Sequence, residues 1–292
     1  MKFLIIIPTH NEEKNILFTL KSLESQTFRD FLCVIVNDGS TDKTQEIVES
    51  FIQENSKFKI QNLELSTHEP GAKVVRTFNK GLEKVALQDF DVICKFDADI
   101  IFPPNYLQKI KTIYEMQPRA GMVSGIVKIK KSIFEKALAF DFKDEKRQWK
   151  FENLSSKNHV RGPIKSYRKE CFLDMNGLRP VLGWDNIDVM LAKKNGWDVL
   201  TIKDLWVKHL RPTAYQYQSQ KARKLGEYFF NIGLDLPLTV ISSAKSSLKN
   251  KSISEFFVTM NSFLKQKGKR ELSDEEIKYI RKLRWSQMLN RK

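Results

Sequence analysis

Short apolar runs alternate with helical patterns through the first hundred residues of the chain. Four runs rich in β-branched and aromatic residues, at 3–7, 31–36, 59–65 and 91–96, predict strands. Between them, apolar side chains recur every three or four residues and predict three helices, which carry Ile16, Leu17, Leu20 and Leu23; Ile47, Val48, Phe51 and Ile52; and Val74, Val75, Phe78, Leu82 and Val85. Strands that alternate with helices form βαβ units, so the pattern predicts an α/β, Rossmann-like fold with a mostly parallel central sheet flanked by helices.

The pattern loosens after residue 100. A proline pair, Pro103 and Pro104, opens a helix that we expect to reach about Met116, and residues 121–129 predict another strand. A less regular region follows and extends to about Arg211. The second part of the domain is therefore predicted in outline only.

The last part of the chain is helical and basic. Apolar residues recur at helical spacing from Ile253 to Leu264 between flanking lysines, which is typical of an amphipathic, basic helix. Residues 273–276 read Ser-Asp-Glu-Glu, a capping box that predicts a final helix. We expect one domain over residues 1–215 and a helical C-terminal extension over residues 216–292.

Charge sharpens this picture of the extension. The chain has a formal net charge of +15, and residues 220–292 hold 16 Lys and Arg against seven Asp and Glu. A local basic excess indicates an anionic partner surface. Zinc-ligand spacing and aromatic RNA-binding signatures are missing from the sequence, so an anionic membrane is the expected partner and nucleic acid is not.

Cysteine usage and hydropathy indicate the compartment. Cys33, Cys94 and Cys171 form no CxxC pair, and the first two lie in apolar runs, as buried reduced thiols of a cytoplasmic protein do. The apolar run at residues 3–7 is too short for a signal peptide, and the stretch 228–244 is too short for a membrane span. We expect a cytoplasmic protein that is peripheral on the inner face of the cell membrane.

Polar residues follow three of the predicted strands. The segments are 8–12 (PTHNE), 37–42 (NDGSTD) and 97–99 (DAD). Ligands of open α/β sheets bind outside the carboxyl ends of the strands, so these segments are candidates for one binding site. Each segment alone also fits a turn or a helix cap.

The acidic pair Asp97 and Asp99 carries more weight. Two carboxylates two residues apart on an extended chain point the same way and repel each other unless a cation lies beside them. Hard oxygen ligands suit Mn²⁺ or Mg²⁺ carrying a diphosphate. A solvated turn is the alternative interpretation.

Four motifs in order, PTHNEE (8–13), VNDGSTD (36–42), Gly71 with RTFNKG (76–81), and FDAD (96–99), resemble the motif series of glycosyltransferase family 2. The resemblance covers about residues 1–211. It implies the GT-A fold, a nucleotide-binding half over residues 1–100 and an acceptor-binding half over residues 101–215. It also implies a nucleotide-sugar donor, with a UDP-sugar expected.

The resemblance assigns roles on the donor side, residue by residue. Thr9 and Glu12 would bind the base and ribose, with Pro8 shaping the turn, and Asp38 would hold the uracil or ribose edge. Arg76 matches an arginine of the family's third motif. Asp97 would contact the ribose or a metal-bound water, and Asp99, which ends the DXD motif, would bind the metal.

On the acceptor side, residues 159–180 resemble the loop and helix that precede the family's catalytic Glu-Asp pair. Trp184 stands where the Glu is usual. Asp185 best matches the general base, with Asp188 as the second candidate and helix capping as the structural alternative for Asp185. His209 stands where many relatives hold the metal or diphosphate, and Arg211 would contact phosphate oxygens.

These expectations combine into one hypothesis. The chain is expected to be an inverting, Mn²⁺- or Mg²⁺-dependent glycosyltransferase that moves a sugar to a glycan or lipid-linked acceptor in polysaccharide or glycoconjugate biosynthesis. The base would remove the acceptor's proton on the face opposite the departing diphosphate. A non-catalytic relative that binds sugar nucleotides or glycans is the alternative, because Trp184 replaces the usual Glu.

Overall fold

The computed structural model describes residues 1–131, 140–142, 148–153, 159–211 and 220–289. Its centre is a nine-stranded sheet with the order β3-β2-β1-β4-β8-β6-β9-β5, and β7 pairs with β6. The strands are β1 Phe3–Thr9, β2 Phe31–Asp38, β3 Phe58–Leu63, β4 Val92–Phe96, β5 Ile100–Ile101, β6 Ala120–Lys130, β7 Trp149–Phe151, β8 Ile164–Arg168 and β9 Asp198–His209. The predicted first four strands and the strand at 121–129 are confirmed.

The sheet changes character at β4. Strands β3, β2, β1 and β4 run parallel, as the βαβ pattern predicts, whereas β8 pairs antiparallel with both β4 and β6. Strands β6 and β9 are again parallel. The region that looked irregular in the sequence therefore supplies the mixed half of the sheet.

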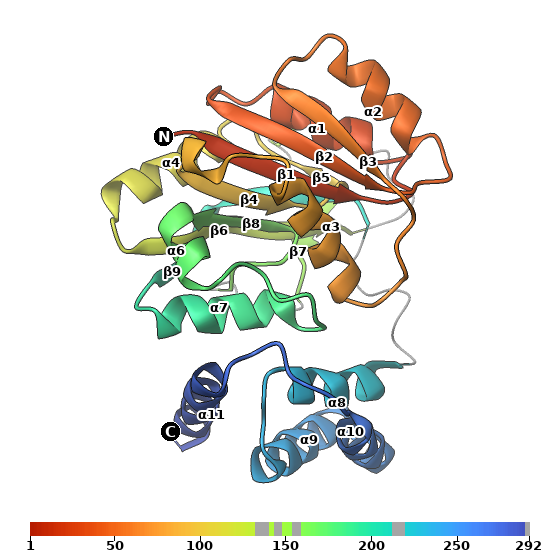
Figure 1. Cartoon of the computed structure of the whole chain (residues 1–292), viewed down its shortest axis with the longest axis vertical. Helices are drawn as coiled ribbons and strands as arrows, with labels where there is room; N and C mark the ends of the chain where they lie inside the picture. Colours follow the sequence, from red (N-terminus) through yellow and green to blue (C-terminus); the bar gives the residue numbers. More distant parts are fainter. Residues whose placement is uncertain (132–139, 143–147, 154–158, 212–219, 290–292) are drawn as a thin grey trace.

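Helices cover both faces of the sheet (Figure 1). They are α1 Ile16–Glu24, α2 Thr44–Ile52, α3 Ala72–Leu82, the 3₁₀ turn Leu87–Asp89, α4 Tyr106–Met116, α6 Lys169–Asp174 and α7 Trp184–Lys194. Alternation along β1 separates two cores: Phe3, Ile5 and Ile7 pack with α1 and α4, while Leu4 and Ile6 pack with α3 and α7. The three cysteines are buried free thiols, as predicted.

Four helices follow the sheet: α8 Lys221–Asn231, α9 Leu236–Asn250, α10 Ile253–Lys265 and α11 Asp274–Leu289. Figure 1 shows them together at the end of the molecule next to α7. The predicted capping box is present at α11, where Ser273 Oγ accepts from the Glu276 amide and the Glu276 carboxylate accepts from the Ser273 amide.

The C-terminal helices share a core with the sheet. Phe229, Ile232 and Ile277 belong to the same buried cluster as Trp184 and Ile187 of α7. Removing the last four helices would therefore expose apolar surface of the sheet domain. Within the part of the chain that the structure describes, no helix is long and apolar enough to cross a membrane.

Candidate active site

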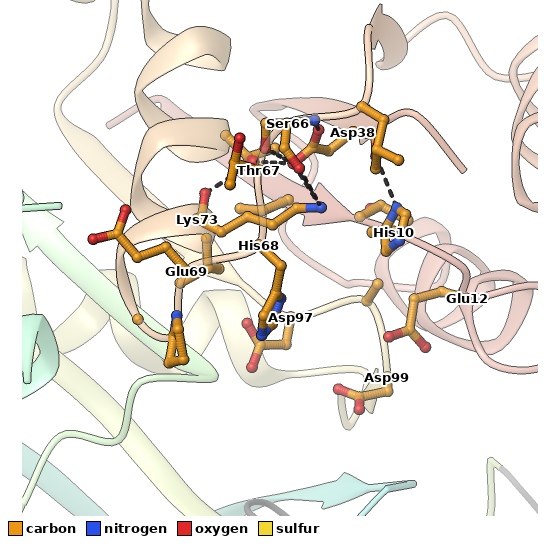
Figure 2. Close-up of a pocket in the computed structure, with 18 of the residues that line it drawn as sticks. His10, Glu12, Asp38, Ser66, Thr67, His68, Glu69, Lys73, Asp97 and Asp99 are labelled. Atoms are coloured by element: carbon orange, nitrogen blue, oxygen red, sulfur yellow. Dashed lines mark hydrogen bonds and ion pairs between the residues drawn. The ribbon is translucent and has the colours of Figure 1, made fainter. Parts of the chain in front are cut away.

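A cavity of about 900 Å³ lies at the carboxyl ends of β1, β2 and β4. This is the size of cavity that binds small molecules and cofactors. Figure 2 shows side chains from all three strand ends facing it. The cavity gathers seven predicted site residues, Pro8, Thr9, Glu12, Asp38, Asp97, Asp99 and Arg211. Four others, Arg76, Asp185, Asp188 and His209, lie outside its lining.

Asp38 is buried and organises one wall of the cavity. Its carboxylate accepts hydrogen bonds from the Ser66 amide at 2.9 Å, the Ser66 hydroxyl at 2.7 Å and the Thr77 hydroxyl at 3.0 Å. The Lys73 ammonium lies 3.4 Å away. Burial acts to raise the pKa of Asp38, but these hydrogen bonds and the Lys73 charge outweigh it and lower the pKa. Asp38 is thus an ionised anchor for the wall formed by residues 65–73.

The end of β1 forms the adjoining wall. Thr9 is buried, and its hydroxyl donates to the Ile7 carbonyl at 3.0 Å, while His10 Nδ1 donates to the Asp38 carbonyl at 2.8 Å. Glu12 accepts from Asn15 and pairs with Arg211. Burial is the main cause that raises the pKa of Glu12. The first two strand ends therefore meet at one polar corner.

Asp97 and Asp99 both line the cavity, as the sequence predicts, but each has its own cationic partner. Asp97 pairs with the Lys95 ammonium from the end of β4. Asp99 lies 3.5 Å from His209 Nε2 and 3.4 Å from Arg211 Nε. Figure 2 shows both carboxylates below His10 and His68. Their mutual repulsion is therefore countered by side chains of this chain.

His209 ends β9 and is held between two acidic side chains. Its Nδ1 lies 3.3 Å from Glu152 and its Nε2 faces Asp99. Burial acts to lower the pKa of His209, but hydrogen bonds and charge from Asp99 and Glu152 outweigh it and raise the pKa to about 9. The surroundings of this ring favour positive charge.

Among the described residues, no group of three His, Cys, Asp or Glu side chains forms a metal site. The donor set nevertheless fits a hard divalent ion that is mostly coordinated by phosphate and water. Such ions need only one or two protein ligands, and Asp99 and the Nε2 of His209, once that nitrogen gives up its proton to the incoming ion, are close enough to serve one ion. Glu152 at Nδ1 is the carboxylate partner that orients metal-binding histidines.

The two candidate bases differ sharply in their surroundings. Asp188 is buried and accepts from both the Lys165 ammonium and the Tyr167 hydroxyl at 2.6 Å. Burial raises its pKa, and these two partners act against the rise. Asp185 lies in the first turn of α7, whose N-cap is Gly183, and is only partly buried. A methyl group at Gly162 would lie 3.6 Å from Asp185 Oδ2, so this glycine leaves space beside the carboxylate.

Trp184 lies between two buried lysines. Lys95 of β4 and Lys165 of β8 are directly opposite each other in antiparallel register. Their ammonium groups lie 5.1 and 5.2 Å from the centroid of the Trp184 ring. Like charges opposite each other on neighbouring strands repel, and the negative face of an aromatic ring counters that repulsion. The tryptophan that replaces the expected Glu therefore still stabilises positive charge.

Arg76 is half-exposed and lies behind the cavity wall without lining the cavity. Its guanidinium pairs with Glu69 at 2.5 Å and donates to the Thr67 carbonyl at 3.3 Å. Because Thr67 and Glu69 line the cavity, Arg76 supports the wall from outside.

Several residues of the site carry no clear signal in the sequence. Lys73 of α3, Leu182 just before α7, and Lys224 of α8 all line the cavity. Helical spacing could have placed Lys73 on the exposed side of α3, but nothing local links residue 224 to the strand ends. The C-terminal extension thus contributes a wall of the cavity.

The loop that precedes Asp185 is held by α8. Asn231 of α8 donates to the Leu182 carbonyl at 3.1 Å. Gly183 has φ +93°, and a methyl group there would lie 2.2 Å from the ring of Tyr228. Tyr228 in turn accepts from Arg284 of α11 at 2.9 Å. Only glycine fits the backbone at this contact.

A parallel half-sheet, an antiparallel strand beside it, and an acidic cavity at the strand ends define the GT-A class of fold. Residues 4–172 match the sequence profile of Glycosyl transferase family 2, which is more than half of the chain. The chain belongs to this family, and the resemblance seen in the sequence is confirmed.

Curated relatives match shorter stretches. An uncharacterised glycosyltransferase of Nostoc sp. is 28% identical over 123 residues, which are 42% of this chain and 36% of the relative. The poly(ribitol-phosphate) beta-N-acetylglucosaminyltransferase TarS of Staphylococcus aureus is 42% identical over 73 residues, 24% of this chain and 13% of TarS. The matched segments therefore span about a third or less of these relatives.

Solved structures match the whole chain in fold. A mannosyltransferase from Pyrobaculum calidifontis, in complex with GDP-Man and Mn²⁺, has a TM-score of 0.59 at 14% identity and covers 100% of this chain and 88% of its own. Residues 1–349 of S. aureus TarS in complex with UDP-GlcNAc have a TM-score of 0.55 at 18% identity, covering 99% and 92%. At these identities the likeness shows the fold, and the GT-A prediction is confirmed.

Proposed function

We propose that this protein is an inverting, divalent-metal-dependent glycosyltransferase that uses a nucleotide-sugar, with a UDP-sugar as the expected donor. The observation that carries the proposal is the convergence of three strand ends on one cavity with both Asp97 and Asp99 in its lining. Two fold relatives were solved with nucleotide-sugars, GDP-Man in one and UDP-GlcNAc in the other. These support the donor class.

In this proposal the cavity holds the nucleotide. Pro8, Thr9 and Glu12 lie along one side of the base and ribose, with the wall anchored by Asp38 on the other. Arg76 braces that wall through Glu69. The positive charge of Arg211 lies beside the acidic pair, where the diphosphate is expected.

Asp99 and His209 are the residues that would hold Mn²⁺ or Mg²⁺, with Asp97 beside them. When bound, the ion supplies positive charge that stabilises the leaving diphosphate. The side chains around it have their own tasks: Lys95 fixes Asp97, and Glu152 orients the His209 ring.

Asp185 is proposed as the general base. It accepts the proton of the acceptor hydroxyl as that oxygen attacks the anomeric carbon from the face opposite the diphosphate, which inverts the configuration. Both oxygens of Asp188 are engaged by Lys165, which also donates to the Asp185 carbonyl at 2.6 Å. Asp188 is therefore proposed to position the first turn of α7 rather than to accept the proton.

The proposed acceptor is a glycan or a lipid-linked glycan, in the synthesis of a polysaccharide or glycoconjugate. The basic C-terminal helices would place the enzyme on the inner face of the cell membrane, with the catalytic domain in the cytoplasm. The domain boundary near residue 215 marks the start of this membrane-facing part.

The metal assignment is tested with Asp99→Asn. Calorimetry with UDP and Mn²⁺ should show binding for the wild type and a loss of at least about 100-fold in affinity for the variant. Removing a residue that merely orients a metal ligand can already lower metal affinity by that factor. Asp198→Asn, which changes an exposed carboxylate at the start of β9, is the matched control. Mn²⁺-dependent binding that survives in Asp99→Asn would refute the metal assignment.

The base assignment is tested with Asp185→Asn. We expect kcat for transfer to fall by about 10²–10⁴, the usual contribution of a general base, while UDP binding is kept. Asp188→Asn should instead lower thermal stability. The alternative has its own signature. If the wild type binds UDP-sugars in the presence of Mn²⁺ but shows no turnover, not even slow hydrolysis of the donor, the protein is a non-catalytic binding protein.

A further inference from the structure

Helices α9 and α10 leave large apolar side chains exposed to solvent and bury mainly small polar ones. Three of the four buried residues of α9 are small and polar: Thr239, Ser243 and Ser247 recur at a spacing of four residues, and Leu238 is the fourth. Large apolar side chains face solvent instead: Leu248 is 80% and Ile241 is 42% exposed. A helix that borders water normally buries its apolar stripe, so α9 is built for an apolar neighbour on its outer side.

Helix α10 repeats the arrangement. It buries Thr259, Ser262 and Phe263, while Ile253 is 79%, Phe257 64% and Leu264 64% exposed. The three exposed positions are separated by four and seven residues and therefore share one face of the helix. Two neighbouring helices thus present apolar faces to the outside.

Specific contacts between α10 and α8 fix this packing. The hydroxyls of Thr259 and Ser262 donate to the Ala222 and Arg223 carbonyls of α8 at 3.1 and 2.6 Å. The helices approach so closely that a methyl group at Gly226 would lie 2.3 Å from the Thr259 carbonyl oxygen. Small residues at the contact are what packed helices in an apolar solvent use. Because these hydrogen bonds hold Thr259 and Ser262 against α8, the side chain of Phe257 points outward.

Exposed lysines surround the apolar faces. Residues 236–270 contain seven Lys and Arg against one Glu, and all six lysines among them are exposed. Lys245 follows Ile241 by one helical turn, and Lys265 directly follows Leu264. Figure 1 shows α9 and α10 at the end of the molecule remote from β1–β3, where a flat surface has access.

We propose that the outer faces of α9 and α10 dock on an anionic lipid bilayer, with Ile253, Phe257 and Leu264 inserted and the lysines at the headgroups. The proposal deepens the membrane part of the proposed function. The helices lie in the plane of the interface, as amphipathic helices with basic flanks do. A second copy of this chain is disfavoured as the occupant, because two such faces would bring like charges together.

Docking in this way also places the cavity. Helix α8 packs its residues 222–226 on α10 and contributes Lys224 to the cavity wall. The membrane-facing helices and the donor cavity are therefore joined through one helix. A lipid-linked acceptor in the bilayer lies next to the same helical group.

The test is co-sedimentation with vesicles of phosphatidylcholine alone and of phosphatidylcholine with 30% phosphatidylglycerol. The wild-type chain should bind the anionic vesicles. Phe257→Ser with Leu264→Ser should weaken binding at least about tenfold, since each residue withdraws a large apolar side chain. Met116→Ser with Leu173→Ser is the matched control, because both are exposed apolar residues outside the C-terminal helices, and it should bind like the wild type.

Charge is tested separately with Lys245→Gln and Lys249→Gln, which should each weaken binding to anionic vesicles about fivefold, as one headgroup contact does. Failure of the wild type to bind anionic vesicles overturns the proposal. So does a dimer in light scattering that Phe257→Ser with Leu264→Ser dissociates, since the face would then be a contact between copies. Deleting the C-terminal helices from α8 onward is unsuitable as a test, because the deletion also removes Lys224 from the cavity wall and part of the core that these helices share with the sheet.

Calorimetry with UDP and Mn²⁺ on the same variants separates this inference from the proposed function. The serine variants should bind UDP as the wild type does, because residues 257 and 264 lie outside the cavity lining. Vesicle binding without UDP binding would leave the docking surface standing and remove the proposed UDP-sugar donor.

Discussion

At the scale of single residues, the buried pair of Lys165 and Asp188 decides how α7 sits on the sheet. Both side chains are almost fully enclosed, with exposed fractions of 0% and 2%. A buried pair gains little over an apolar replacement, whereas removing one partner leaves an uncompensated charge. The Lys165 ammonium also binds the Asp185 carbonyl, so the pair fixes the turn that carries the proposed base.

This asymmetry predicts a non-additive result. Lys165→Met alone should lower the free energy of unfolding by about 3–5 kcal/mol, since it strands the Asp188 carboxylate. The double variant Lys165→Met with Asp188→Leu should be less destabilised than Lys165→Met alone. Urea unfolding at neutral pH measures both, and strictly additive losses would contradict the account.

At this scale the sequence predicts which strand-end residues meet in one cavity. Asp38, Asp97 and Asp99 follow strands, and the carboxyl ends of parallel strands meet at one edge. Lys95 and Lys165 could not be paired in advance, because their contact depends on the antiparallel register of β4 and β8. For the same reason, the sequence does not decide whether Asp185 or Asp188 is the base. The two carboxylates differ in their contacts with side chains of β8.

At the scale of elements, the sequence does not reveal β5, β7, β8 and β9, and the last two show the physical reason. Strand β8 buries Lys165 and Ser166 through ion pairs and hydrogen bonds, which hides the alternation of apolar and polar positions. Strand β9 has exposed polar residues at Lys203 and Asp204 in its middle, next to a shift in its pairing with β6. Buried polar residues satisfied by tertiary contacts are invisible to periodicity.

The junction between α7 and α8 gives a prediction at this scale. Gly183→Ala should lower the free energy of unfolding by about 2–4 kcal/mol, from the positive φ and the contact with Tyr228 together. Gly196→Ala is the matched control: Gly196 also has positive φ, at +80°, but has no atom within 4 Å of the added methyl, so about 1 kcal/mol is expected.

Chemical denaturation of both alanine variants measures the difference, and equal losses would remove the proposed role of Tyr228. Restoring stability by combining Gly183→Ala with Tyr228→Leu would assign the loss to this one contact.

At the scale of the whole molecule, one buried cluster runs from the sheet through α7 into α8, α9, α10 and α11. The sequence divides the chain near residue 215 by composition, since basic helical residues begin there. The basic composition reflects the exposed surface of the extension, whereas its inner side packs on the sheet domain. We therefore expect the two parts to unfold together.

Ligand binding should raise the midpoint temperature of this single unfolding transition. UDP with Mn²⁺ at 100 times the dissociation constant adds about 2.7 kcal/mol, which raises Tm by about 4–5 °C in a chain of this size. UDP with a chelator should leave Tm nearly unchanged, and GDP in place of UDP tests the nucleotide. Two transitions, with only one shifted, would show instead that the helical part unfolds independently.

Lys224 has a consequence for engineering this protein. Helix α8 supplies one cavity wall, contacts Leu182 and Gly183 at its other end, and carries α10 on its outer side. A chimera that takes its tail from another family member would therefore inherit a foreign cavity wall as well as a foreign attachment surface. Exchange of tails should preserve activity only when residues 181–184 are exchanged with them.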